Sequence, residues 1–389
     1  MTSKKSLTDY WFVIEPYVYV RVTKAHALLY NTLDGVTLES YNIEIINLLR
    51  ELLEKENCGV LLLRSNTYMQ KEINNFIRVL RKNYMGDIID INLSNGKPVQ
   101  LMPYYNYPNN HKIYKKKNFT PISNILENLT EISIHVDNTT DIQKMISFLK
   151  SMQGAPIFNI VGNVWDIPDY YELFTFLKQH PSQKNLLCSY TQVKLLQVVF
   201  EEKFSYNISV HFPINMHELN NAILLLCNQT SPIEFSFHVS SIEDLQQTER
   251  LVEQFKIKKY QMIPIYTGDN MRYFEENVFL TKKDILSLSI SMKDIFIHQS
   301  MNIYDYGKIS IMSNGDAYAN INYPILGNIF KHSFQKIVQK EVDEGKSWFR
   351  IRNQAPCNDC VYQWLCPSPS NYEIVIGRSN LCHVIQQQL

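Results

Sequence analysis

The hydrophobic positions of the N-terminal residues alternate between strand-like and helix-like spacing. Tyr10 to Val22 is rich in aromatic and β-branched residues and contains Pro16, which predicts two short strands. Apolar side chains recur at helical spacing from Ser40 to Glu56, and a second helix is predicted to end at Gly86. The apolar face of this second helix consists of Ile73, Phe76, Ile77 and Leu80. Ile88 to Ile91 then predicts a further strand.

From residue 119 to residue 290 the pattern is a regular alternation of short apolar runs with amphipathic helices. The six runs expected to be strands are Glu131 to Val136, Ile157 to Val161, Asn185 to Tyr190, Asn207 to Phe212, Ile233 to Val239 and Lys259 to Ile265. The helix after the fifth run opens with Ser241-x-x-Asp244, the pattern of a capping box. Repeated strand–helix–strand connections require parallel pairing, because right-handed crossovers return each strand beside the previous one. Such units fit an incomplete barrel or an open sheet, and periodicity alone does not decide between them.

The C-terminal part begins with a predicted hairpin. Lys308 to Met312 and Ala317 to Asn320 flank Asn314-Gly315, which is a signal for a type I′ turn. A helix from Ser333 to Glu344 then leads into a tail rich in Pro, Asn and Ser, where little regular structure is expected. We therefore expect three parts, which are residues 1–118, 119–290 and 291–389.

Composition and charge exclude several classes of protein. With 45% hydrophobic and 20% charged residues, the 389-residue chain has the composition of a folded globular protein. Its 38 Lys and Arg balance 38 Asp and Glu, so we expect neither nucleic acid nor a membrane surface as a partner. The longest apolar stretches, such as Ala222 to Cys227, are shorter than the roughly 20 residues of a membrane-spanning helix. We expect a cytoplasmic protein with reduced cysteines, and a solvated linker from Asn106 to Lys117.

Four of the seven cysteines lie in the C-terminal tail and give the strongest chemical signal in the chain. They are Cys357, Cys360, Cys366 and Cys382. The two-residue gap of the first pair lets both sulfurs face one centre, and the other two cysteines complete a shell of four thiolates. Zinc and iron–sulfur clusters both bind in this way, and the spacing does not separate them. The plainer alternatives are free thiols or a redox pair.

The tail also resembles a known family. Cys357-x2-Cys360, then Cys366-Pro-Ser-Pro-Ser-Asn-Tyr-Glu and Asn380-Leu-Cys382, resemble the C-terminal SPASM domain of radical S-adenosylmethionine peptide maturases of Bacteroidales. The upstream sequences Asn314-Gly-Asp and Leu326-Gly-Asn-Ile are similar to the same domain. In the family this domain holds two auxiliary four-iron clusters. The resemblance implies that the four cysteines here correspond to the ligands of the second cluster. The first would need cysteines near Tyr304, at Asn320 and at Ser370, and the sequence has none there.

The resemblance also implies that the catalytic site has been lost. Active members carry Cys-x3-Cys-x2-Cys after the first strand of a six-unit partial barrel, whereas the corresponding loop here, Asp137 to Asp141, contains no thiol. After the second strand the family places Gly-Gly-Glu-Pro, and this chain has Gly162-Asn-Val-Trp. Asn, Thr and Asp side chains cannot hold a four-iron cluster of this kind. We therefore expect no bound S-adenosylmethionine and no radical catalysis.

Taken together, the resemblance implies an α/β chain with a partial (β/α)6 barrel at residues 119–290. It also implies a small α+β, winged-helix-like N-terminal region and a C-terminal SPASM-like domain. The stretch from Ala27 to Gly35 is similar to N-terminal regions of related maturases, which include elements that bind precursor leader peptides. The implied function is that of a noncatalytic partner or scaffold that binds a ribosomally made precursor peptide, an active radical maturase or both. The implied cofactor is one [4Fe–4S] cluster, with zinc as the alternative. The alternative function is an iron–sulfur electron-transfer subunit for such a maturase.

Three histidines form a separate candidate site. His135, His211 and His238 fall on the first, fourth and fifth predicted strands of the alternating part, near the strand ends. They are interpreted as hydrogen-bonded side chains that line the interior of a barrel without its cofactor. A metal or acid–base site with an unrelated enzymatic activity is the other possibility.

Overall fold

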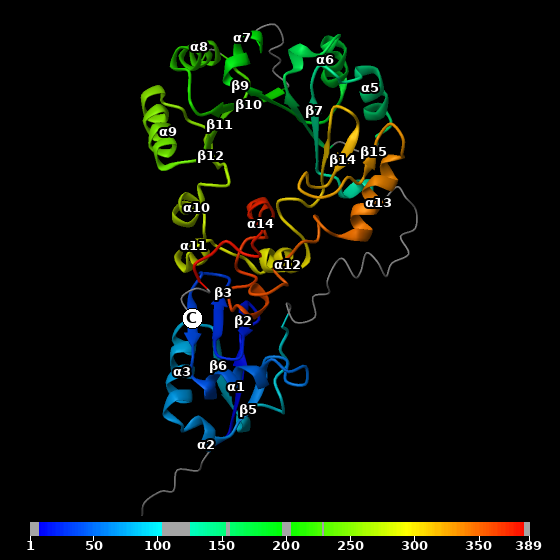
Figure 1. Ribbon diagram of the computed structural model, residues 1–389. Helices are drawn as coiled ribbons and strands as arrows, with labels where there is room; N and C mark the ends of the chain where they lie inside the picture. The colour runs from blue at the N-terminus through cyan, green and yellow to red at the C-terminus, as the bar shows by residue number, and fades with distance from the viewer. Residues whose placement is uncertain (1–7, 103–124, 153–155, 197–203, 228, 385–389) are drawn as a thin grey trace, which may run out of the picture.

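The structure is a computed structural model that describes residues 8–102, 125–152, 156–196, 204–227 and 229–384. Within these residues the chain is a mixed α/β protein with two small antiparallel sheets and one nine-stranded sheet. The small sheets lie in the N-terminal part, drawn in blue and cyan, and the large sheet lies in the remainder of the chain (Figure 1). The predicted linker from Asn106 to Lys117 lies outside the described residues.

The N-terminal part contains six strands and three helices among the described residues. Its strands are β1 (Tyr10–Ile14), β2 (Val18–Val22), β3 (Ala27–Asn31), β4 (Thr37–Ser40), β5 (Val60–Leu63) and β6 (Gly86–Asp90). Its helices are α1 (Ile43–Leu52), α2 (Ser65–Tyr68) and α3 (Lys71–Lys82). The strand orders are β5-β1-β6 and β2-β3-β4. The two strands predicted around Pro16 and the two amphipathic helices are therefore confirmed.

Gly86 does not end a helix as the sequence predicts. Helix α3 is capped at Asn83, and Gly86 is the first residue of β6, paired with Ile14 of β1. A Cβ atom on Gly86 would lie 2.4 Å from the Val13 carbonyl oxygen. The glycine therefore permits the close approach of two strands, a role that a sequence pattern does not distinguish from a helix stop.

The large sheet has the order β12-β11-β10-β9-β8-β7-β13-β14-β15. Six consecutive parallel strands, β7 to β12, confirm the predicted alternation, and β13 extends the parallel run beside β7. These strands are β7 (Glu131–Val136), β8 (Ile157–Gly162), β9 (Lys184–Ser189), β10 (Phe204–His211), β11 (Ile233–Val239), β12 (Tyr260–Pro264) and β13 (Lys308–Ile311). The sheet curves, and its helices lie on the outer face (Figure 1). These helices are α5 (Ile142–Lys150), α6 (Tyr170–Gln179), α7 (Val193–Leu196), α8 (Met216–Leu226) and α9 (Ile242–Phe255).

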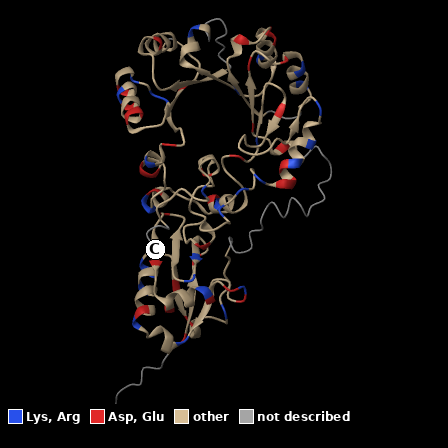
Figure 2. Cartoon of the chain, viewed as in Figure 1, with Lys and Arg blue, Asp and Glu red and all other residues tan. Residues whose placement is uncertain are grey.

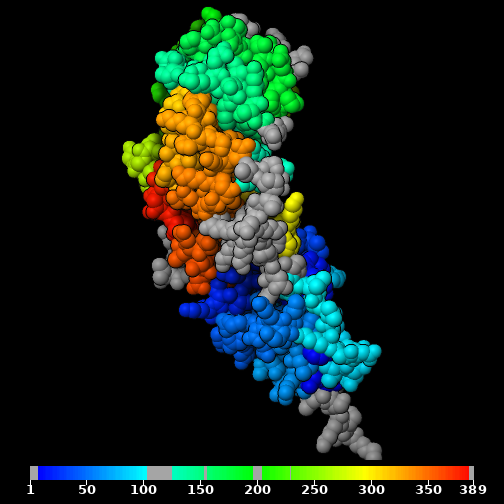
Figure 3. Space-filling view, turned by 90° about the vertical axis from the view of Figure 1, so that its right-hand side faces the viewer, coloured from blue at the N-terminus to red at the C-terminus, as the bar shows by residue number. Residues whose placement is uncertain are grey.

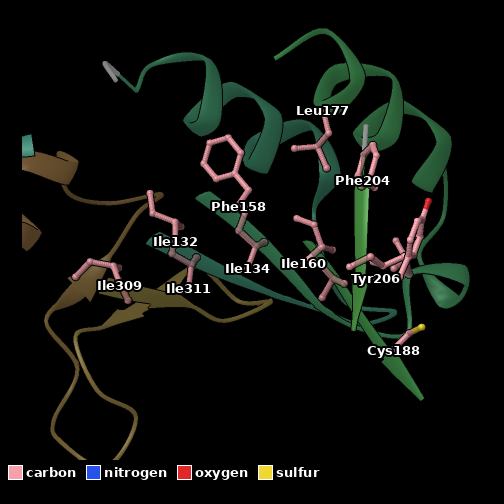
Figure 4. Close-up of a cluster of buried hydrophobic side chains, with 14 of the residues drawn as sticks. Ile132, Ile134, Phe158, Ile160, Leu177, Cys188, Phe204, Tyr206, Ile309 and Ile311 are labelled. Atoms are coloured by element: carbon pink, nitrogen blue, oxygen red, sulfur yellow. The ribbon is translucent and has the colours of Figure 1, made fainter. Parts of the chain in front are cut away.

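The core of this part lies between the strands and the outer helices. Along β7, Ile132, Ile134 and Val136 are buried, while the alternate residues Glu131, Ser133 and His135 are half-buried on the concave face. The same alternation continues on the neighbouring strands, and Figure 4 shows Phe158, Ile160 and Phe204 beside Leu177 of α6. Burying each such side chain stabilises the fold by about 1.5–3 kcal/mol. The polar residues between them are left to line the concave face.

Two local predictions are corrected by the structure. The hairpin of β13 and β14 (Asp316–Tyr318) is present, but its turn is not type I′, because Gly315 is left-handed (φ +84°) and Asn314 is not. The Gly315 N–H donates to the Met312 carbonyl at 2.8 Å, which is the geometry of a type I turn followed by a left-handed glycine. At the start of α9, Ser241 accepts the Asp244 N–H as expected, but the Asp244 carboxylate accepts from the Ser240 N–H instead of completing a capping box.

The C-terminal part packs against both the large sheet and the N-terminal part. Helices α10 (Met271–Asn277) and α11 (Lys282–Ser287) precede it, and its remaining elements are α12 (Met292–Ser300), β15 (Gly327–Asn328), α13 (Phe334–Glu344) and α14 (Asn371–Ile376). Helix α13 packs on the core of the large sheet, which confirms the helix predicted from Ser333. In contrast, Ile290, Ile295, Tyr362 and Leu365 are buried in the core of the N-terminal part. Figure 3 shows the C-terminal residues, in orange-red, in contact with the blue N-terminal part.

None of the described helices is both long and apolar enough to cross a bilayer. Figure 2 shows the positions of Lys and Arg (blue) and of Asp and Glu (red) interspersed along the described chain.

Candidate metal centre

The four cysteines predicted to be ligands line one small enclosed cavity. Cys357, Cys360, Cys366 and Cys382 surround it together with Arg352, Gln363 and the apolar side chains of Leu280, Ile285, Leu381 and Val384. The Gln363 Oε1 atom is buried without a hydrogen-bond partner. Among the described residues no three His, Cys, Asp or Glu side chains are arranged as a preformed site for a single ion. The case for a cofactor therefore rests on the shared cavity and on the chemistry of four thiols.

Two separate segments bring these cysteines together. Cys357 begins a short 3₁₀ turn, and the Cys360 N–H donates back to the Cys357 carbonyl at 3.1 Å. The Cys366 N–H donates to the Tyr362 carbonyl at 2.9 Å, so the first three cysteines belong to one knuckle of tight turns. Cys382 comes from the other side of the cavity, where it forms an isolated parallel bridge with Leu280. This pairing fixes the position of the fourth thiol relative to the knuckle.

The thiols of the knuckle lie in surroundings that disfavour their ionised form. Burial raises the pKa of the Cys360 thiol to about 11 and raises the pKa values of Cys357 and Cys366 as well. The guanidinium of Arg352 opposes burial at Cys357 and Cys366. At neutral pH the knuckle thiols are therefore protonated, and any metal that binds them must displace their protons.

Two N–H groups point at the sulfurs. The Arg352 Nη1 atom lies 3.8 Å from Cys357 Sγ, and the Asn380 Nδ2 atom lies 3.1 Å from Cys382 Sγ. Donors of this kind orient thiolate ligands and stabilise their negative charge in metal sites. The residue types were visible in the sequence, but neither residue stands at a spacing that would have identified it as a neighbour of the cysteines.

A second, open cavity of about 470 Å³ lies on the concave face of the large sheet, toward the carboxyl ends of β8 to β12. It includes the stacked rings of His211 and His238, whose centroids are 4.0 Å apart at an interplanar angle of 8°. Burial, and then the neighbouring His211, lower the pKa of His238 to about 4, so this ring is neutral at pH 7. A chain of hydrogen bonds runs from Gln261 through Ser236 to Asn207. Among the residues that the structure describes, no Asp, Glu, Lys or Arg lines the cavity.

The structure brings together only two of the three predicted histidines. His135 lies on β7 and does not line this cavity, and burial lowers its pKa. His211 has a hydrogen bond to Ser209 at 2.9 Å, while His238 Nδ1 is buried without a partner. None of the described residues that line the cavity is a carboxylate that could orient or charge this pair.

The loop from Asp137 to Asp141 is closed by its own hydrogen bonds. The Asp137 carboxylate accepts from the Ser313 hydroxyl at 2.7 Å and from the Thr139 N–H at 2.7 Å. The Asp141 carboxylate accepts the Lys144 N–H and caps α5. These oxygens therefore serve to close the loop, to attach it to the β13–β14 turn and to start a helix.

A buried polar network joins separate segments of the C-terminal part. The Asp305 carboxylate accepts from Asn320 at 3.1 Å and from the Ser347 hydroxyl at 2.9 Å, and it lies 3.5 Å from the Arg350 guanidinium. Arg350 also donates to the carbonyl of Ser370 at 3.0 Å. The sequence reasoning did not find this network.

The cysteine knuckle also contacts the β2-β3-β4 sheet. Glu39 of β4 accepts from His26 at 3.2 Å and from Lys282 at 2.9 Å. Burial would raise the pKa of Glu39, but hydrogen bonds from His26, Lys282 and Tyr362 lower it to about 2. Arg21 of β2 donates to the Asn358 carbonyl at 2.8 Å, inside the knuckle. The N-terminal part and the thiol cavity are thus attached by polar contacts as well as by a shared core.

Comparison with known proteins adds no relative. No protein-family model matches the chain, and no curated protein matches it.

Proposed function

We propose that this chain is a degenerate radical S-adenosylmethionine/SPASM protein that acts as a noncatalytic partner in the maturation of ribosomally made peptides. The observation that carries the proposal is a contrast between two sites. Four cysteines from two segments share one enclosed cavity, whereas the loop from Asp137 to Asp141 has no thiol and uses its carboxylates for structure. In this proposal a cofactor site is kept in the C-terminal tail, whereas the site in the loop after β7 is lost.

The arrangement of the strands supports the proposed fold. Six consecutive parallel strands with outer helices, in a curved sheet whose end strands are β12 and β15, are what an incomplete (β/α)6 barrel requires. The proposed winged-helix-like region is the N-terminal part with its two small sheets, and the proposed SPASM-like domain is the segment from residue 291 to 389. In this interpretation the concave cavity with His211 and His238 is the remnant of the cofactor site.

The proposed cofactor is one [4Fe–4S] cluster held by Cys357, Cys360, Cys366 and Cys382, with a structural zinc ion as the alternative. When bound, such a cluster supplies one-electron chemistry or only a crosslink between the two segments. The chain itself contributes a small enclosed cavity, two N–H donors at the sulfurs and the attachment of the knuckle to the N-terminal part.

Peptide binding is proposed for the N-terminal part. Strands β2 and β4 are the edges of a three-stranded antiparallel sheet, and β5 and β6 are the edges of the other. A peptide can add to such an edge as a further strand, with main-chain hydrogen bonds giving affinity and side-chain pockets giving specificity. The partner would then be a precursor peptide, and an active maturase would modify it while this chain holds it.

The test begins with metal analysis of protein purified without oxygen. We expect ~4 irons and ~4 inorganic sulfides per chain, as a four-thiolate cluster requires. Cys366→Ser should lose most of this iron, while Cys227→Ser, at an exposed cysteine outside the cavity, should keep it. A content of one zinc per chain without iron would support a structural zinc ion and reject the cluster. The absence of any metal would refute both forms of the site.

The partner role is tested by co-expression with an active radical maturase and its precursor peptide. We expect a stable complex, and a loss of peptide modification when this chain is omitted. The absence of any complex, together with unchanged modification, would refute the role. The electron-transfer alternative is favoured only by the half-buried state of Cys360 and Cys382, which would leave one side of a cluster near the surface. It requires a cluster that is reduced and reoxidised reversibly, so a redox-silent centre excludes it.

A further inference from the structure

A buried ion pair adjoins the thiol cavity. Arg352 is 8% exposed and Glu373 is 5% exposed, and Arg352 Nη1 lies 3.0 Å from Glu373 Oε1. The guanidinium is held further by the carbonyls of Pro367 at 2.6 Å and Ser368 at 3.5 Å. The same Nη1 atom lies 3.8 Å from Cys357 Sγ. One nitrogen of the guanidinium therefore faces both a carboxylate and a sulfur.

Only the positively charged member of this ion pair lines the thiol cavity. Arg352 lines the cavity, and no other Lys or Arg and no Asp or Glu does so among the described residues. Glu373 does not line the cavity, and its second oxygen accepts the Ser370 N–H at 2.7 Å in the capping box of α14. The positive end of the pair thus lies at the sulfurs, and the negative end is tied to a helix behind it.

A gain in the stability of the fold does not by itself account for a buried ion pair. Removing two charges from water costs several kcal/mol per ion, and apolar side chains of similar volume are often equally stable or better. Four thiolates, by contrast, concentrate negative charge in a site of low dielectric constant, where an adjacent guanidinium interacts strongly with them. The charge of Arg352 is permanent, so this interaction does not depend on pH.

We propose that Arg352 is a positioning residue that raises the reduction potential of the group bound by the four cysteines, and that Glu373 limits this effect. This inference rests on the proposed cluster. Reduction adds an electron to the site, and a nearby positive charge stabilises the reduced state more than the oxidised state. Hydrogen bonds to the sulfurs and net charge are the means by which proteins adjust such potentials.

The experiment measures the midpoint potential of the anaerobically purified full chain and of three variants by a dye-mediated optical and EPR titration. Arg352→Gln removes the positive charge and should lower the potential by at least about 59 mV, which is a tenfold change in the ratio of reduced to oxidised cluster. Glu373→Gln keeps the cap of α14 but leaves Arg352 uncompensated, so it should raise the potential. Arg352→Lys keeps the charge and should lie closer to the unmodified protein than Arg352→Gln does.

A matched control separates charge from general loosening. Arg350→Gln removes a second buried guanidinium of the same segment, which pairs with Asp305 and does not line the cavity. It should leave the potential unchanged. Midpoint potentials that shift in the same direction in Arg352→Gln and Glu373→Gln would overturn the inference. Loss of packing would shift both potentials in one direction, whereas removal of opposite charges should shift them in opposite directions. An unchanged potential in Glu373→Gln would also overturn it, even if Arg352→Gln fails to retain iron.

These outcomes are distinct from failure of the proposed function. Iron and sulfide absent from the unmodified protein reject the cluster, and the inference with it. Iron present with unaltered potentials rejects the inference alone.

Discussion

Replacement of Glu341 by Gln should remove a large part of the pH dependence of stability. Glu341 lies on α13 and is 2% exposed. Its Oε1 atom accepts the N–H groups of Ser347 at 2.8 Å and Trp348 at 2.7 Å. Burial raises the pKa of Glu341 to about 7, against the opposing effect of these two hydrogen bonds, and Asp305 adds to the increase. In the folded chain the carboxyl group is therefore mostly neutral below about pH 7.

The sign of the effect follows from this shift. The unfolded chain loses the Glu341 proton near pH 4.5 and the folded chain near pH 7, so stability falls as pH rises through this interval and is constant above it. Each pH unit of the interval is worth about 1.4 kcal/mol, which limits the total loss to roughly 3 kcal/mol. Glu341→Gln cannot ionise and keeps an oxygen for the two N–H groups. Its advantage over the unmodified protein should grow from pH 5 to pH 8.

The assay is hydrogen exchange of the Ser347 and Trp348 amides, measured by mass spectrometry from pH 5 to pH 8 and corrected for intrinsic exchange rates. In the unmodified protein their protection should decrease as pH rises, and in Glu341→Gln it should stay nearly constant. Glu344→Gln is the matched control. Glu344 lies on the same helix, but its pKa is lowered by Lys346, whereas the pKa of Glu341 is raised by burial. Parallel pH profiles for Glu341→Gln and the unmodified protein would refute the reasoning.

Three further predictions concern other contacts. Glu39→Gln should weaken the attachment of the N-terminal part to Lys282. It should also remove a loss of stability that occurs in the unmodified protein as pH falls from 4.5 toward 2, and thermal unfolding at pH 3 and pH 7 would detect this change. Asn320→Ala should cost about 1–3 kcal/mol by leaving Asp305 short of a donor, and an unchanged denaturation midpoint would contradict this role. Gly162→Ala should destabilise the chain strongly, because a Cβ would lie 2.3 Å from the Val136 carbonyl oxygen and Gly162 has a backbone φ of +119°. A melting temperature equal to that of the unmodified protein would contradict this prediction.

Much of the large sheet was predictable because its signal is local and repeated. Each run such as Glu131 to Val136 is apolar on alternate positions toward the helices, and each is followed by an amphipathic helix, so period and length identify both. Strand β4 was not predicted, because Thr37 to Ser40 has only four residues, all half-buried, and is recognised only when it pairs with β3. Pairing partners far apart in the chain decide such short strands.

The candidate site was predictable only in part. Thiol chemistry singles out the four cysteines without any fold, and the structure places them around one cavity. Arg352, Asn380 and Glu373 have ordinary surface residue types, and only tertiary structure gives them their neighbours. The turn at Gly315 shows the same limit on a smaller scale, since Asn-Gly is compatible with more than one turn and the register of β13 and β14 selects between them.

The core that the N-terminal part shares with Tyr362, Leu365 and Val384 has a consequence for biosynthesis. Side chains of β2 and β3 leave the ribosome well before the residues that cover them are translated. The apolar face of the N-terminal part therefore stays incomplete until Tyr362, Leu365 and Val384 have been made. An assembly of this kind favours chaperone contact during synthesis and makes shortening the tail damaging to the opposite end of the molecule.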